Sequence, residues 1–197
     1  KQGNEPRIDG DEATIQTAIQ WLEQRTSHKP WVMWVPLLAP HPPFMVEDPW
    51  FSLHNRDSMP EPIRPEDTTG KPEYMNELRK RYGWADLSIE DHAEITATYY
   101  GMVSRVDDQL GRLLLAIDQF GYADNTYTFC FSDHGEYLGD HGLVEKWPSG
   151  LDPCLVQNPL IVAGPKVTES EVVQSGVEMI DLLPTCLEIA ETEASHT

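Results

Sequence analysis

The sequence has few basic residues and no long hydrophobic run. Its 197 residues contain 14 lysines and arginines against 33 aspartates and glutamates, a formal net charge of −19. This charge repels nucleic acid and anionic membrane surfaces, so neither is an expected partner. No apolar run approaches the roughly 20 residues that span a bilayer, so no membrane span is expected. Internal repeats and low-complexity tracts are also missing, and the 40% hydrophobic content indicates a globular protein.

Cysteine is also scarce. Cys130, Cys154 and Cys186 have neither the spacing of a metal site nor the even number of a disulfide set. Cys130 falls in an apolar run, where we interpret it as a small core residue. The chain starts at Lys1 without an initiator methionine, so we expect a segment of a longer protein. The compartment stays open: a signal peptide upstream would indicate a periplasmic or secreted protein, and its absence a cytoplasmic one.

The first half of the chain predicts a helix, a strand and a long excursion. Apolar residues recur at helical spacing from Asp11 to Gln24. The continuous apolar run Trp31–Val35 is typical of a strand buried on both faces. Residues 45–87 show no sustained periodicity, which predicts an irregular excursion with short helices around Glu73 to Arg81.

The second half predicts a long helix followed by short strands. Ser88 to Asp91 resembles a capping box and starts the longest helical pattern, which Gly121 closes. Two buried strands, a last strand piece and a last helix are then expected, at Tyr127–Phe131, Leu160–Ala163, Val172–Gln174 and Asp181–Ala190. The alternation predicts one α/β domain, or part of one.

The loop from Ser132 to Gly142 is the richest in groups that carry chemistry. It follows a predicted buried strand, and open α/β sheets hold their active sites at the carboxyl ends of strands. Asp133 and His134 pair a carboxylate with an imidazole, which suits manganese, zinc or iron, whereas a carboxylate-rich remainder would suit calcium or magnesium. The spacing fits equally well an aspartate that accepts turn hydrogen bonds beside a solvent-facing histidine.

Five other polar residues are weaker candidates. Lys146 could neutralise a substrate oxygen or assist a leaving group, although an isolated loop lysine is more often a solvated surface charge. His41 stands between prolines that stiffen the backbone, and is as well explained by a structural role as by a catalytic one. Glu136, Asp140 and His141 could brace the loop by hydrogen bonding to the metal ligands.

Five sequence elements point in order to one family. They are Ala-Pro-His-Pro-Pro-Phe at 39–44, Phe-Ser-Asp-His-Gly-Glu-Tyr-Leu-Gly-Asp-His-Gly-Leu at 131–143, Lys146, Asn-Pro-Leu-Ile-Val at 158–162 and Ile-Asp-Leu-Leu-Pro-Thr at 180–185. Together they resemble the sulfatase family of the alkaline-phosphatase superfamily, which has phosphonate monoester hydrolases as close relatives. The elements Ser-Asp-His-Gly-Glu and Leu-Gly-Asp-His-Gly are specific as a pair.

The resemblance implies a fold and a site. The fold would be an α/β three-layer α/β/α sandwich of the alkaline-phosphatase type, with residues 1–197 forming the later half of the catalytic domain and lacking its N-terminal portion and the small C-terminal domain. Asp133 and His134 would supply part of a divalent-metal site, for calcium first and manganese as the alternative. Many sulfatases have asparagine where His134 stands. His41 and Lys146 would contact the bridging ester oxygen or a sulfate oxygen.

The resemblance also implies a nucleophile that this chain does not contain. In sulfatases it is a formylglycine hydrate made from a Cys/Ser-x-Pro/Ala-x-Arg motif, which does not occur here, so it is expected upstream. The implied activity is hydrolysis of small-molecule or carbohydrate sulfate esters. Phosphonate monoesters or phosphodiesters are the alternative substrates, and an inactive truncated or degenerate homologue is the alternative of another class. By itself the chain is predicted to be inactive and to bind metal weakly.

Overall fold

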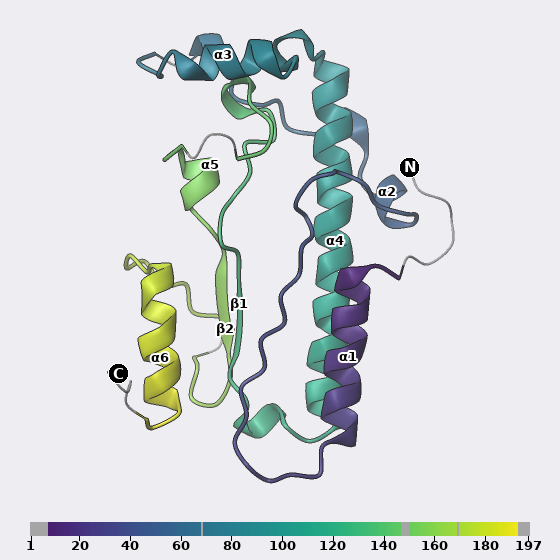
Figure 1. Ribbon diagram of the computed structural model, residues 1–197, viewed down its shortest axis with the longest axis vertical. Coiled ribbons are helices and arrows are strands. Elements are labelled where there is room, and N and C mark those ends of the chain that lie inside the picture. Colours follow the sequence, from purple (N-terminus) through teal and green to yellow (C-terminus); the bar gives the residue numbers. More distant parts are fainter. Residues whose placement is uncertain (1–7, 68, 147–149, 169, 193–197) are drawn as a thin grey trace.

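The computed structural model describes residues 8–67, 69–146, 150–168 and 170–192. Helices dominate these residues, joined by single turns of 3-10 helix and one pair of short strands (Figure 1). The helices and strands are α1 Gly10–Gln24, α2 Trp50–Leu53, α3 Tyr74–Arg81, α4 Ile89–Gln119, β1 Thr128–Phe131, α5 Pro153–Val156, β2 Leu160–Ala163 and α6 Leu182–Ile189. The predicted helices at Asp11–Gln24, Glu73–Arg81 and Asp181–Ala190 are confirmed within a residue or two.

Helix α4 begins and ends at the signals expected from the sequence. At its start the Ser88 side chain accepts the Asp91 N–H while the Asp91 carboxylate accepts the Ser88 N–H, which is a reciprocal capping box. At its end Gly121 adopts a φ of 77°, and the Tyr122 N–H donates to the Ile117 carbonyl at 2.9 Å. This pattern satisfies carbonyl groups that a helix otherwise leaves unpaired.

Helices α1 and α4 pack along each other and form the main core (Figure 1). The buried residues are aliphatic and come from both helices: Ile15, Ala18, Leu22, Leu113 and Ala116. Side chains of the extended segment 31–37 pack against this cluster from the sheet side. Removing such side chains from water is the main source of stability, at about 1.5–3 kcal/mol for each large aliphatic group.

The segment Trp31–Val35 corrects one prediction. It is not a strand buried on both faces, but an extended run beside β1 whose side chains alternate between core and solvent (Figure 1). Val32 is 91% exposed and Trp34 is 72% exposed, whereas Met33 packs on the core. Among the described residues no strand pairs with it. An unbroken apolar run carries no period, so the sequence could not show which face is covered.

Strands β1 and β2 pair antiparallel, with Thr128 opposite Ala163 and Phe131 opposite Leu160. Both predicted strands are confirmed, but they are less buried than expected, and Ile161 is 64% exposed. The predicted strand piece at 172–174 is wrong, since these residues form no strand. Helices α1 and α4 lie on one side of the strand pair and α6 on the other (Figure 1). A two-stranded sheet is consistent with part of a layered domain, and the full three-layer sandwich stays a prediction.

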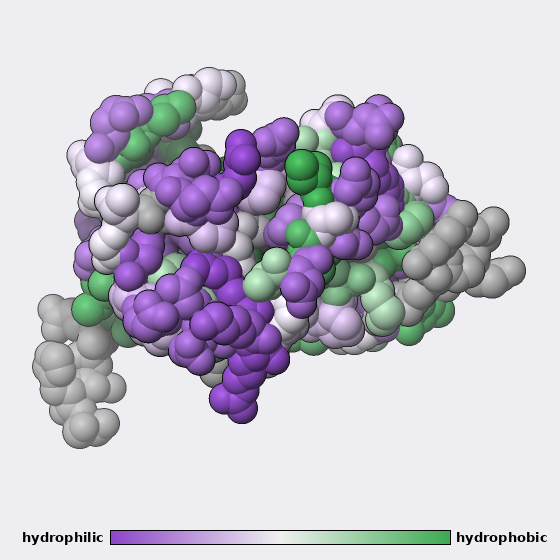
Figure 2. All heavy atoms as spheres, turned by 90° about the horizontal axis from the view of Figure 1, so that it is seen from above, coloured by the Kyte–Doolittle hydropathy of each residue, from purple (hydrophilic) through white to green (hydrophobic). Residues whose placement is uncertain are grey.

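The described residues of 45–87 form the predicted irregular excursion, which includes α3 and lies around the N-terminal end of α4. A buried ion pair ties its start to α4, with 2.8 Å between Glu47 Oε1 and Arg105 Nε. Seen from the α3 end, the surface is mainly hydrophilic, with small scattered hydrophobic areas (Figure 2). No helix in the described part of the chain is long and apolar enough to cross a membrane.

Candidate active site

The structure brings His41 and Lys146 into direct contact. The Nε2 atom of His41 lies 2.5 Å from Nζ of Lys146, although 105 residues separate them in the chain. The Nδ1 atom of the same ring lies 2.9 Å from the Pro42 carbonyl oxygen, which can only accept. These partners place the ring proton on Nδ1, so that Nε2 accepts a hydrogen bond from the Lys146 ammonium. Two residues predicted separately therefore form one hydrogen-bonded unit.

His134 stands beside this unit. Its ring meets that of His41 edge to face, with 6.3 Å between the ring centroids. Its Nδ1 atom lies 2.8 Å from the Gly135 carbonyl oxygen, which assigns the proton to Nδ1 and leaves Nε2 as a free electron-pair donor. Histidine ligands of metals characteristically use their second nitrogen in this way.

Asp133 and His134 fit as a pair of metal ligands. Oδ1 of Asp133 lies 3.8 Å from Nε2 of His134, within the about 4 Å that separates two ligands held at about 2.0–2.2 Å from one ion. The Asp133 side chain is 82% exposed, so its oxygens are accessible. In the described part of the chain no group of three or more His, Cys, Asp or Glu residues could hold a metal. The metal site predicted at Asp133 and His134 therefore stays a prediction, with two candidate ligands among the described residues.

The loop that carries Asp133 and His134 is anchored on the α5 segment. The Gly135 N–H donates to the Leu155 carbonyl at 2.8 Å, and the Glu136 N–H donates to the Cys154 carbonyl at 3.0 Å. A Cβ atom at Gly135 would lie 1.9 Å from the Cys154 oxygen. Only glycine allows the two backbones to approach this closely.

Glu136 supports the backbone next to Lys146. Its Oε1 atom accepts the N–H of Leu138 at 3.0 Å and the N–H of Glu145 at 2.5 Å. Leu138 and Glu145 have φ values of 50° and 67°, in the left-handed region that residues other than glycine rarely adopt. Burial raises the pKa of the Glu136 carboxyl, against the lowering effect of these two N–H groups and of the Lys146 charge.

Asp140 and His141 dock the excursion onto the loop. Oδ1 of Asp140 accepts the Ile63 N–H at 2.8 Å, and the His141 N–H donates to the Ile63 carbonyl at 2.6 Å. Arg79 Nη1 also donates to the His141 carbonyl at 2.7 Å. These bonds run to the excursion, and the predicted bracing of the metal ligands by the two residues stays a prediction.

One residue near the site was not identified from the sequence as a functional candidate. Asp11 lies in the first turn of α1 and is buried. Its two carboxylate oxygens accept the N–H groups of Leu38 and Ala39, each at 2.8 Å, just before His41. An acidic residue in the first turn of a helix is ordinary, so the sequence contained no signal for this contact.

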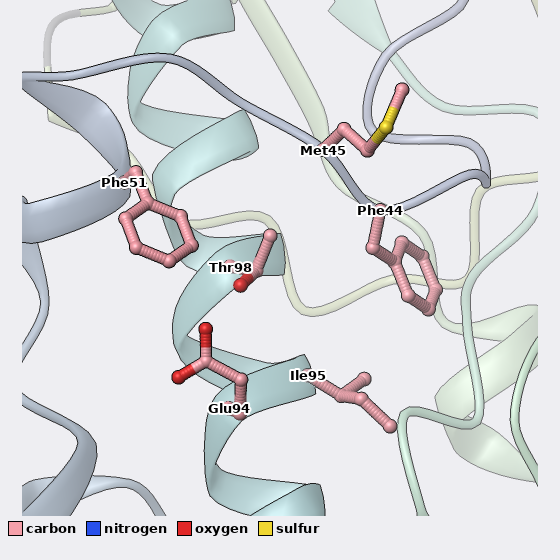
Figure 3. A pocket seen from close by; sticks show the side chains of 6 residues that line it. All are labelled: Phe44, Met45, Phe51, Glu94, Ile95 and Thr98. Atoms are coloured by element: carbon pink, nitrogen blue, oxygen red, sulfur yellow. The ribbon is translucent and has the colours of Figure 1, made fainter. Parts of the chain in front are cut away.

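A small cavity lies beside Phe44 and Met45, which follow His41 by three and four residues (Figure 3). Its volume is about 180 Å³, and its walls come from residues after His41, from α2 and from α4: Phe44, Met45, Phe51, Glu94, Ile95 and Thr98. Most of these side chains are apolar. The carboxylate of Glu94 is already paired with Arg56, at 2.9 Å.

The sulfatase family model matches residues 4–192, which is nearly the whole chain. This chain belongs to the sulfatase family. The match covers both loops that meet at the contact between His41 and Lys146.

Two curated relatives are each 30% identical to this sulfatase-family chain. One is the multifunctional alkaline phosphatase superfamily protein PehA of Trinickia caryophylli, over 187 residues, covering 87% of this chain and 36% of the relative. The other is a sulfatase of Formosa agariphila, over 186 residues, covering 90% of this chain and 36% of the relative. The chain thus spans about a third of the length of these relatives.

Solved structures support the same family. A phosphonate monoester hydrolase from Silicibacter pomeroyi superposes with a TM-score of 0.76 at 25% identity, covering 96% of this chain and 43% of that one. A protein solved in complex with its substrate D-glucosamine-2-N,6-O-disulfate superposes with a TM-score of 0.79 at 22% identity, covering 96% of this chain and 50% of that one. The second likeness concerns the fold alone. The described helices and strands are therefore part of a sulfatase-type fold.

Proposed function

We propose that this chain forms the leaving-group side, and part of the metal side, of an enzyme that hydrolyses sulfate esters. The observation that carries the proposal is the 2.5 Å contact between His41 and Lys146, with the ring of His134 against that of His41. Membership of the sulfatase family supports the choice of a sulfate ester.

The chemistry follows from where charge develops. When the S–O bond breaks, the bridging oxygen takes the electron pair and becomes negative. Lys146 supplies positive charge at that point, and the proton it shares with His41 Nε2 can pass to the departing alcohol. The Pro42 carbonyl holds the Nδ1 proton of His41, so that Nε2 is the nitrogen that faces Lys146.

Asp133 and His134 are the proposed metal ligands, for calcium first and manganese as the alternative. A bound divalent ion would supply positive charge to the sulfate oxygens. Asp133 contributes an accessible carboxylate and His134 an unprotonated Nε2. The nucleophile is proposed to be a formylglycine hydrate outside this chain, where it would attack the sulfur atom.

The alcohol part of the substrate is proposed to be a small molecule or a carbohydrate. A fold relative was solved with a sulfated glucosamine as its substrate, which supports a sugar. The cavity lined by Phe44, which follows His41 by three residues, provides a mostly apolar surface for the alcohol part (Figure 3).

A second candidate is hydrolysis of phosphonate monoesters or phosphodiesters. Its support is His134 together with two phosphonate monoester hydrolase structures at 25% and 28% identity. Sulfate monoesters, phosphonate monoesters and phosphodiesters all carry one negative charge. A single Lys146 therefore does not separate these substrates.

Substrate competition tests the proposal. The complete reading frame that contains this chain is expressed with a formylglycine-generating enzyme and loaded in turn with calcium or manganese. We expect kcat/KM for 4-nitrophenyl sulfate to exceed that for 4-nitrophenyl phenylphosphonate and bis(4-nitrophenyl) phosphate. The reverse order would favour the second candidate. Loss of all three activities, with no Cys/Ser-x-Pro/Ala-x-Arg motif upstream, would identify an inactive homologue.

A further inference from the structure

Two carboxylates, the buried one of Asp11 and the half-buried one of Glu136, accept hydrogen bonds from the two backbone segments that carry His41 and Lys146. On the His41 side, Asp11 accepts the N–H groups of Leu38 and Ala39, one on each of its oxygens, at 2.8 Å. The Leu38 carbonyl in turn accepts the His41 N–H at 2.9 Å. A short chain of hydrogen bonds thus connects α1 to the backbone of His41.

On the Lys146 side, the carboxylate that accepts backbone hydrogen bonds is that of Glu136. One oxygen, Oε1, accepts both the Leu138 N–H at 3.0 Å and the Glu145 N–H at 2.5 Å. Glu145 directly precedes Lys146 and has a left-handed φ of 67°. A backbone in this sparsely populated region persists only where its surroundings hold it.

We propose that Asp11 and Glu136 are positioning residues that together set the contact between His41 and Lys146. The inference rests on the proposed function, in which this pair meets the leaving-group oxygen. Each carboxylate acts on the backbone and not on the substrate. Displacing a catalytic group by as little as 1 Å can slow a reaction about 100-fold. The hydrogen bonds of Asp11 and Glu136 therefore matter for catalysis as well as for folding.

The two carboxylates accept their hydrogen bonds differently, so the amide variants of Asp11 and Glu136 should have different effects. Asp11 uses both oxygens, so Asp11→Asn turns an NH2 group toward a backbone N–H and loses one acceptor. Glu136 uses a single oxygen, so Glu136→Gln keeps an acceptor for both N–H groups, whereas Glu136→Ala removes it. We therefore expect Asp11→Asn to disturb the backbone before His41 and Glu136→Gln to preserve the backbone before Lys146.

The test measures how rate depends on the leaving group. In the complete enzyme, kcat/KM is measured for a series of aryl sulfates whose phenols span several pKa units. The quantity compared between variants is the slope of log kcat/KM against the pKa of the phenol. His41→Ala defines the slope expected when leaving-group assistance is lost. We expect Asp11→Asn and Glu136→Ala to steepen the slope, with about 10–100-fold greater loss on the poorest leaving group than on the best. Glu136→Gln should keep the original slope.

A neighbouring carboxylate supplies the control. Glu12 follows Asp11 on α1 and pairs with Arg112 at 2.6 Å, away from the His41 segment. Glu12→Gln should lower thermal stability and leave the slope unchanged. The double variant Asp11→Asn/His41→Ala should be no steeper than His41→Ala alone, because both changes affect one function.

The outcomes separate the inference from the function on which it rests. In one outcome, Asp11→Asn and Glu136→Ala lower kcat/KM equally for all leaving groups while His41→Ala steepens the slope. That result would overturn the inference and leave the proposed function standing. An unchanged slope in His41→Ala would overturn the proposed role of the pair. If Asp11→Asn fails to fold, Glu136→Ala with its glutamine counterpart decides the question from the other loop.

Discussion

Gly135 approaches Cys154 so closely that a Cβ atom would stand 1.9 Å from the Cys154 carbonyl oxygen. The same contact contains the hydrogen bond from the Glu136 N–H to that oxygen, at 3.0 Å. The backbone after Asp133 and His134 is therefore seated directly on the α5 segment. The position of Asp133 and His134, the proposed metal ligands, depends on a residue without a side chain.

Gly135→Ala tests this seating. We expect the substitution to lower the free energy of unfolding by about 2–3 kcal/mol, because the backbones must separate to admit the methyl group. Gly111→Ala is the matched control, since a Cβ there meets no atom within 4 Å and Gly111 lies within α4. It should raise stability by about 0.5–1 kcal/mol. Urea unfolding measures both, and equal effects of the two substitutions would contradict the interpretation.

Lys146→Ala should impair the proposed reaction in the complete enzyme. We expect kcat to fall by about 10²–10³, the size found when one preorganised electrostatic group is removed from an active site. Added methylammonium should restore part of the rate by supplying a cation at the vacated position. Lys80→Ala is the control, because Lys80 is exposed and pairs with Glu77 on its own helix at 3.4 Å. A fall that methylammonium does not relieve would argue for a structural role of Lys146.

Metal affinity should depend on Asp133 and His134. Asp133→Ala or His134→Ala should weaken calcium or manganese binding to the complete protein by more than the about 10–100-fold typical of outer-shell partners. Asp140→Asn is the control, because its carboxylate accepts the Ile63 N–H. Calorimetry measures all three variants. An equal loss in the control would instead support the predicted bracing of the ligands by Asp140.

The isolated 197-residue chain should bind either metal more weakly than micromolar, because its described residues contain no group of three or more candidate ligands. Ethylenediaminetetraacetate should then leave its thermal unfolding unchanged. Sub-micromolar affinity in calorimetry would contradict the interpretation that Asp133 and His134 supply part of a metal site.

Acid should remove the stability that Glu12 contributes. The guanidinium of Arg112, hydrogen-bonded to the carboxylate, lowers the pKa of Glu12 from 4.5 to about 2. A lowered folded-state pKa means that the contribution is complete above about pH 4.5 and is lost as the pH falls toward 2. Because the Arg112 side chain is 40% exposed, solvent screening limits the contribution to about 1–2 kcal/mol. Urea unfolding between pH 2 and pH 6 should show this loss in the original protein and not in Glu12→Gln.

Interactions within a few residues along the chain determined the features that the sequence predicted well. The capping box of Ser88 and Asp91 and the closing Gly121 set the ends of α4 wherever the helix packs. The motifs around His41 and Asp133 likewise identified the sulfatase family, because their residue types follow one another without interruption.

Only the tertiary structure decided which groups meet. The sequence suggested His41 and Lys146 separately, and it held no sign that Asp11 would accept two N–H groups 27 and 28 residues away. It also suggested a fully buried strand at Trp31–Val35, where the packing of α1 and α4 covers one face and leaves Trp34 72% exposed. Local propensity acts over one or two turns of chain. The contacts that build the site close loops of up to 105 residues, and only the packed core selects among the many ways of closing them.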